Sequence, residues 1–175
     1  MEQQPIDTQI NEEWFRAYEY YFRELLTARF YRNVFNFVCF AQLILGSAFM
    51  ANIASWWVAG FITTTLSAYI FVYNPGAIAS AAKRQSARYE KILHQFHEFT
   101  PDDVATQFSR LSETDSPVPE SLVLPAYFLA YCATCRTLTD PEAERQADKI
   151  KRNLTCLERV YAFIAGSILR SGAKC

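Results

Sequence analysis

The sequence contains no charged residue between Arg32 and Lys83. A helix that crosses the hydrocarbon core of a bilayer needs roughly 20 predominantly apolar residues. The uncharged segment is long enough for two such helices, and it divides near Asn52. The sequence therefore predicts two membrane-spanning helices, at about residues 34–51 and 56–73, joined by a very short turn.

The flanking sequence has helical patterns on both sides of this segment. Aromatic and aliphatic residues at spacings of three and four precede it, which is typical of one buried helix face. The predicted fold is an all-α membrane protein, in which a two-span transmembrane hairpin carries N- and C-terminal cytoplasmic helices that form a bundle. We divide it into an amphipathic helix over 1–32, the hairpin over 33–75 and a cytoplasmic helical region over 76–175. The alternative, two buried helices of a bundle in water, would need other protein to cover the entire uncharged segment.

Basic residues lie on both sides of the predicted hairpin, and its turn contains none. They are Arg29, Arg32, Lys83, Arg84 and Arg88. Cytoplasmic flanks of membrane helices carry an excess of lysine and arginine. The pattern therefore predicts a multi-pass protein with both termini in the cytoplasm.

Five polar residues of the predicted spans are candidates for lining a pore. They are Asn36, Gln42, Ser47, Thr63 and Ser67. Polar side chains within a bilayer tend to face other helices or water. The alternative is that they only hold helices together, since serine and threonine can bond to their own helix backbone. One hairpin cannot enclose an aqueous path, so conduction would need several copies around an axis.

The C-terminal region is predicted to be a series of short helices. Pro101, followed by two acidic residues, is typical of a helix start. Residues 112–119 form the clearest loop. An apolar stretch at 120–138 is uncharged for only about fifteen residues. It is predicted to be a buried helix bent by Pro125, because it is short for a third span.

The last predicted helix begins with Asp140 as its cap. Apolar residues then recur in steps of four and three, the spacing of a heptad seam. We interpret the central five, Ile150, Leu154, Leu157, Tyr161 and Ile164, as an oligomer seam. The pattern alone leaves open whether this seam packs within one chain or between subunits.

The sequence offers little support for an enzyme, a metal site or a nucleic-acid partner. The net charge of −1 gives no concentrated basic surface for phosphates. Cys132 and Cys135 with His94 and His97 have spacings that zinc could use, but both pairs lie in apolar helical patterns where packing is the simpler interpretation. We therefore expect no cofactor, no metal and no nucleic acid as the main partner.

Arg88 and His94 form an Arg-x5-His string that is similar to the signature of HEPN ribonucleases. On one continuous helix, residues six apart are separated by about 120° around the axis, so they would not converge on one phosphate. We therefore predict no catalytic residues, and the ribonuclease remains the less favoured alternative.

The order of these features resembles the SLATT family over residues 12–135. The resemblance is carried by the aromatic arm, the two closely spaced apolar helices, the basic helix AAKRQSARYEKILHQF and the segment SPVPESLVLPAYFLAY. It implies a bacterial inner-membrane effector that assembles into pores during antiphage defence. The partners it implies are the lipid bilayer, further copies of the chain, and a nucleotide second messenger or an upstream defence protein.

The resulting functional prediction is an oligomeric effector that forms membrane pores or disrupts membranes, gated through its cytoplasmic helices. The alternative is a non-conducting, membrane-anchored adaptor whose cytoplasmic helices recruit another protein.

Overall fold

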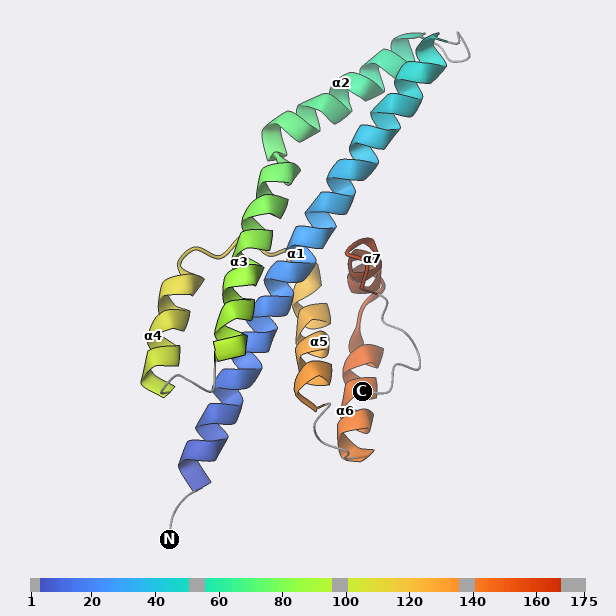
Figure 1. Ribbon diagram of the computed structural model, residues 1–175. Coiled ribbons are helices and arrows are strands. Elements are labelled where there is room, and N and C mark those ends of the chain that lie inside the picture. Colours follow the sequence, from blue (N-terminus) through green and yellow to red (C-terminus); the bar gives the residue numbers. More distant parts are fainter. Residues whose placement is uncertain (1–3, 51–55, 96–100, 136–140, 168–175) are drawn as a thin grey trace.

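The structure, a computed structural model, describes residues 4–50, 56–95, 101–135 and 141–167 (Figure 1). Every regular element in these ranges is helical. The all-α part of the predicted fold class is therefore confirmed.

Helix α1 (Gln4–Met50) is a single continuous helix of 47 residues that runs the length of the molecule (Figure 1). No glycine or proline occurs between Pro5 and Gly46, so nothing in the sequence interrupts the backbone hydrogen bonds. The helical spacing before the uncharged segment predicts a helix that runs straight into that segment, and the continuous α1 confirms this. The sequence predicts Asn11 as the cap of this helix, but the helix begins earlier, at Gln4.

Helices α2 (Trp56–Tyr73) and α3 (Pro75–Gln95) return along α1 and meet at Asn74 (Figure 1). Asn74 has a φ of 40°, and its side-chain Oδ1 accepts a hydrogen bond of 3.3 Å from the amide of Ala77. Asparagine tolerates the left-handed region better than most residues. From the sequence alone, Gly76 is the residue expected to adopt a left-handed exit at the end of the second apolar helix. In the structure Gly76 lies within α3.

No helix in the part of the chain that the structure describes is both long enough and apolar enough to cross a membrane. The predicted two-span transmembrane fold and the predicted multi-pass inner-membrane localisation are therefore wrong. Helix α2 has 18 residues and is about 27 Å long, whereas the hydrocarbon core of a bilayer is about 30 Å thick. Its three consecutive threonines, at 63–65, make it less apolar. In α1, Asn33, Asn36 and Gln42 interrupt the apolar run. The predicted turn at 52–55 lies outside the described residues.

The remaining helices pack around the N-terminal half of α1, and we call this part the head. They are α4 (Pro101–Ser112), the 3-10 turn η2 (Glu120–Leu122), α5 (Val123–Cys135), α6 (Pro141–Asn153) and α7 (Cys156–Ile164). In Figure 1, α3 and α4 lie on one side of α1, and α5, α6 and α7 lie on the other. A cluster on the second side joins Leu26 of α1 to Leu122, Ala126 and Ala165.

Two predictions for the head are confirmed. Helix α4 begins at Pro101, and the short apolar helix is packed in the head, with Leu122, Ala126 and Ala130 fully buried. Pro125 lies in the first turn of α5, where its missing amide costs little, so it does not bend that helix.

The single helix predicted after Asp140 is divided into α6 and α7 at Leu154 and Thr155. Thr155 and Glu158 form a capping box: the Glu158 amide donates to Thr155 Oγ1, and the Thr155 amide donates to Glu158 Oε2 at 2.7 Å. Such a box satisfies the free amides at a helix start, and it fixes the break here. The expected cap at Asp140 lies outside the described residues.

The five residues predicted as an oligomer seam therefore do not form one continuous stripe. Ile150 is half-buried on α6, and Leu154 is buried at the break. On α7, Leu157 is exposed, whereas Tyr161 stacks on Phe30 of α1. Ile164 is half-buried at the end of α7.

Candidate functional site

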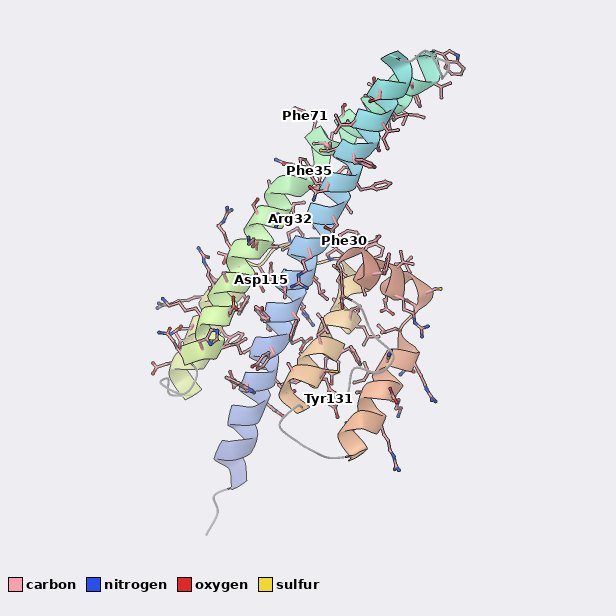
Figure 2. All side chains as sticks on the ribbon, turned by 45° about the vertical axis from the view of Figure 1, so that its right-hand side comes forward. Phe30, Arg32, Phe35, Phe71, Asp115 and Tyr131 are labelled. Atoms are coloured by element: carbon pink, nitrogen blue, oxygen red, sulfur yellow. The ribbon has the colours of Figure 1, made fainter. Side chains whose placement is uncertain are left out.

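The uncharged parts of α1 and α2 project beyond the head as a pair of helices, which we call the arm (33–47 and 57–73; Figures 1 and 2). Its side chains are largely apolar and exposed. Phe37 and Phe61 are each 72% exposed and Phe71 is 88% exposed. The others are Phe40, Leu43, Ile44, Trp57, Val58, Ile62, Val72 and Tyr73. So large an apolar surface is unusual on a monomer in water and marks a site of interaction.

Four hydroxyl groups of the arm donate hydrogen bonds to carbonyls of their own helices. Ser47 donates to the carbonyl of Leu43 at 2.8 Å, and Thr64 donates to that of Gly60 at 2.8 Å. Thr65 and Ser67 donate to carbonyls four residues earlier, each at 2.9 Å. Burying a hydroxyl in apolar surroundings is costly unless it has such a partner. These bonds lower the cost of covering the arm with apolar material.

Of the five predicted pore-lining residues, Gln42 and Ser67 are joined by a side-chain hydrogen bond between the two helices. Gln42 Nε2 of α1 donates a hydrogen bond of 2.9 Å to Ser67 Oγ of α2. Asn36 and Ser47 are exposed on α1, and Thr63 is half-buried on α2. The five residues therefore do not line one common face.

All five predicted flanking basic residues are exposed near the base of the arm. The ring of Phe35 lies 3.9 Å from the position that a Cβ at Gly76 would take, so these two residues mark one level of the antiparallel pair α1 and α3. At a rise of 1.5 Å per residue, the backbone positions of the basic residues lie about 5 to 18 Å from that level along the helix axes, on the side toward the head. Figure 2 shows Arg32 directly below Phe35. The five are Arg29, Arg32, Lys83, Arg84 and Arg88.

Helix α7 is attached to α1 at the same base. Asn33 Nδ2 donates a hydrogen bond of 2.6 Å to the carbonyl of Ile164. The rings of Phe30 and Tyr161 stack at a centroid distance of 4.7 Å. Figure 1 shows α7 nearly end-on beside the long α1, and Figure 2 shows it running sideways. The sequence analysis missed this element, although Thr155 and Glu158 have the spacing of a capping box.

A buried polar cluster holds the loop before η2 against α1 and α3, and the sequence analysis also missed it. The Ser116 amide donates a hydrogen bond of 2.8 Å to Glu24 Oε1. Asp115 Oδ1 accepts from Tyr89 Oη at 2.8 Å and from Gln85 Nε2 at 2.9 Å (Figure 2 labels Asp115). These bonds connect residues that no local sequence pattern relates.

Glu24 in this cluster is 1% exposed. Burial raises the pKa of its carboxyl above the usual value for glutamate, the hydrogen bonds from Ser116 partly oppose the shift, and the charge of Asp115 adds to it. Its Oε2 has no hydrogen-bond partner among the described residues. Burial is also the main cause that raises the pKa of Tyr89, and the contact with Asp115 contributes. The cluster is chemically suited to holding the loop against α1 and α3.

The geometry favours neither the ribonuclease site nor the zinc site. Arg88 and His94 are exposed on the uninterrupted helix α3, about 120° apart around its axis. Among the residues that the structure describes, no group of three or more potential metal ligands comes together. The side chains of His97 and Cys135 lie outside the described residues.

Comparison of the chain with protein-family models, with curated proteins and with solved structures finds no match. The resemblance to the SLATT family therefore stays a prediction from the sequence.

Proposed function

We propose that the chain is a self-associating effector that docks its apolar arm into a lipid surface and perturbs the bilayer. The observation that carries this proposal is the exposure of large apolar side chains on both helices of the arm. Docking of this kind needs no helix that crosses the membrane, since apolar helices also bind by inserting into the headgroup and acyl boundary.

The breadth of the apolar surface favours lipid over a protein groove. On α2 the exposed apolar residues, from Phe71 through Trp57 to Tyr73, cover about 200° of the helix circumference. A helix that packs on one protein partner usually presents a stripe about 100° wide. Acyl chains can surround a helix on all free sides.

The charge distribution favours a lipid surface with anionic headgroups. The arm itself is uncharged, and the basic residues gather next to its base. Each lysine or arginine close to an anionic lipid surface contributes roughly 1 kcal/mol of attraction. An inserted arm would place these side chains beside the headgroups.

Self-association is supported by the arm's surface. A Cβ added at Gly46 or Gly60 would meet no atom within 4 Å, so a second helix could approach closely at either position. Asn36 is an exposed amide on an otherwise apolar stretch of α1, and an amide there gains from a hydrogen bond to a neighbouring copy.

The resemblance to SLATT effectors is the sole support for a role in bacterial antiphage defence. It also suggests the trigger, a nucleotide second messenger or an upstream defence protein acting on the head. Conduction through a pore would need several arms around an axis.

The test is flotation of the purified protein with vesicles of phosphatidylglycerol and phosphatidylethanolamine, combined with release of a trapped dye. The wild-type protein should bind and release the dye. Phe37→Ser with Phe61→Ser should bind at least about tenfold more weakly, because two apolar contacts are lost. The matched control, Phe37→Leu with Phe61→Leu, keeps the surface apolar and should retain binding.

A wild-type protein that does not bind, or a serine pair that binds equally well, would overturn the proposal. Binding without dye release would overturn the perturbing role and favour the membrane-anchored adaptor.

A further inference from the structure

We infer that α7 is a second contact of this protein with the lipid surface, lying flat at the boundary between headgroups and acyl chains. The inference rests on the proposed function, because it assumes that the arm enters lipid. Docking of the arm does not itself require α7, and the inference gives this helix a role.

The outer face of α7 is apolar and exposed. Leu157 is 57% exposed, Val160 is 52% exposed and Phe163 is 76% exposed. Their spacing of three spreads them over an apolar stripe about 120° wide on the helix. Tyr161 and Ala165 mark the packed side of α7, where they contact Phe30 of α1 and the cluster around Leu26. Around the helix axis Phe163 lies about 160° and Val160 about 100° from Tyr161, so both point away from this packed side, and Leu157 lies at its edge, about 40° from Tyr161.

The position of α7 fits the boundary of a lipid layer. In its last turn, the carbonyl of Ile164 accepts the hydrogen bond from Asn33. Asn33 directly follows Arg32 and is the first residue of the arm. The helix lies across α1 at this level (Figures 1 and 2). An arm inserted up to its base would therefore bring α7 into the plane of the headgroups, the plane in which amphipathic helices bind.

The charges on and beside α7 also fit an anionic surface. Arg152 and Arg159 are exposed, and Lys151 is half-buried. The nearby acid, Glu158, is held in the capping box by Thr155. The exposed charges near the stripe are therefore mainly positive, which a headgroup phosphate can match.

A fluorophore on α7 can test this contact directly. Cys156 is exposed and lies about 20° from Phe163 around the helix, so a label there reports on the stripe. With the other cysteines changed to serine, an environment-sensitive dye on Cys156 should brighten at least twofold on phosphatidylglycerol vesicles. The control label, at Lys91→Cys on the exposed side of α3, should not change.

A paired binding assay keeps this inference separate from the proposed function. Leu157→Ser with Phe163→Ser should weaken flotation several-fold, whereas Leu157→Ile with Phe163→Leu should not. If the arm variants lose binding while the α7 serine pair binds normally and the dye stays dim on bound protein, the inference is overturned and the proposed function stands. A wild-type protein that does not float overturns both. If the dye instead brightens with rising protein concentration in the absence of lipid, the stripe binds a second copy of the chain, and the lipid contact is overturned.

Discussion

Asn33 donates a hydrogen bond of 2.6 Å to the carbonyl of Ile164, a residue 131 positions later in the sequence. The last carbonyls of a helix lack partners within that helix, and here a side chain of α1 supplies one. The bond joins the end of α7 to the point where the arm leaves the head. It sets the relative position of the two apolar surfaces to which we assign lipid contact.

Replacing Asn33 with alanine should loosen α7. The hydrogen bond is near the surface, so we expect a loss of about 0.5–1.5 kcal/mol in the free energy of unfolding. Urea denaturation measures this loss, and hydrogen exchange should show faster exchange in residues 156–165. Asn36→Ala, one turn further along α1, is the control and should alter neither quantity. Unchanged exchange in α7 would contradict the role of this bond.

Removing the hydroxyl of Tyr89 should destabilise the head. Tyr89→Phe leaves Asp115 without one of its two donors, while the ring stays packed on Tyr20 and Phe108. Because Asp115 is partly exposed, we expect a loss of about 1–2 kcal/mol in the free energy of unfolding, measured in urea. Tyr73→Phe, at an exposed position of α2, should change it by less than about 0.5 kcal/mol. Equal losses in the two variants would contradict the account.

The buried carboxyl of Glu24 should make the stability of the head depend on pH. Its pKa is raised in the folded state, mainly by burial. The folded protein therefore holds this proton to higher pH than the unfolded chain, and the free energy of unfolding should fall as pH rises from about 4.3 through the folded pKa. Asp115 and Tyr89 are ionisable groups that interact with this carboxyl.

Urea denaturation across pH 4 to 8 measures this slope. Glu24→Gln keeps an oxygen for the Ser116 amide and should flatten the fall. Glu12→Gln, at an exposed position, should leave the slope as it is in the wild-type protein. A Glu24→Gln slope equal to that of the wild type would show that another group is responsible.

The junction between α2 and α3 should require asparagine or glycine at position 74. Asn74→Ala places a β-carbon in the left-handed region and removes the bond to the Ala77 amide. We expect it to reduce the free energy of unfolding by about 1–2 kcal/mol. Asn74→Gly relieves the backbone and should recover part of the loss. An alanine variant as stable as the glycine variant would contradict this assignment.

The sequence was sufficient to predict the elements that local patterns determine. The helix before the uncharged segment followed from its apolar spacing, and the start of α4 followed from Pro101. The break at Thr155 was missed because Leu154 and Leu157 keep a helical spacing across it. The contact between Glu24 and Ser116 joins positions 92 apart, and no local pattern encodes such a pairing.

The candidate site was predicted in part. The absence of charge correctly located the arm, but the polar residues within it shorten the apolar runs, and the crossing predicted from charge alone was wrong. The basic residues were found because their sequence positions flank the uncharged segment. The outer face of α7 could not be recognised, because its exposure depends on which side of the helix packs against Phe30.

The most direct test of the account is whether lipid reaches the side chains of the arm. Trp57 is 66% exposed on α2, and with Trp14 and Trp56 changed to phenylalanine it becomes the sole tryptophan. On phosphatidylglycerol vesicles that contain brominated acyl chains, its fluorescence should be strongly quenched, and aqueous acrylamide should quench it less than in solution. Fluorescence that is unaffected by the brominated lipid and still open to acrylamide would contradict the insertion of the arm.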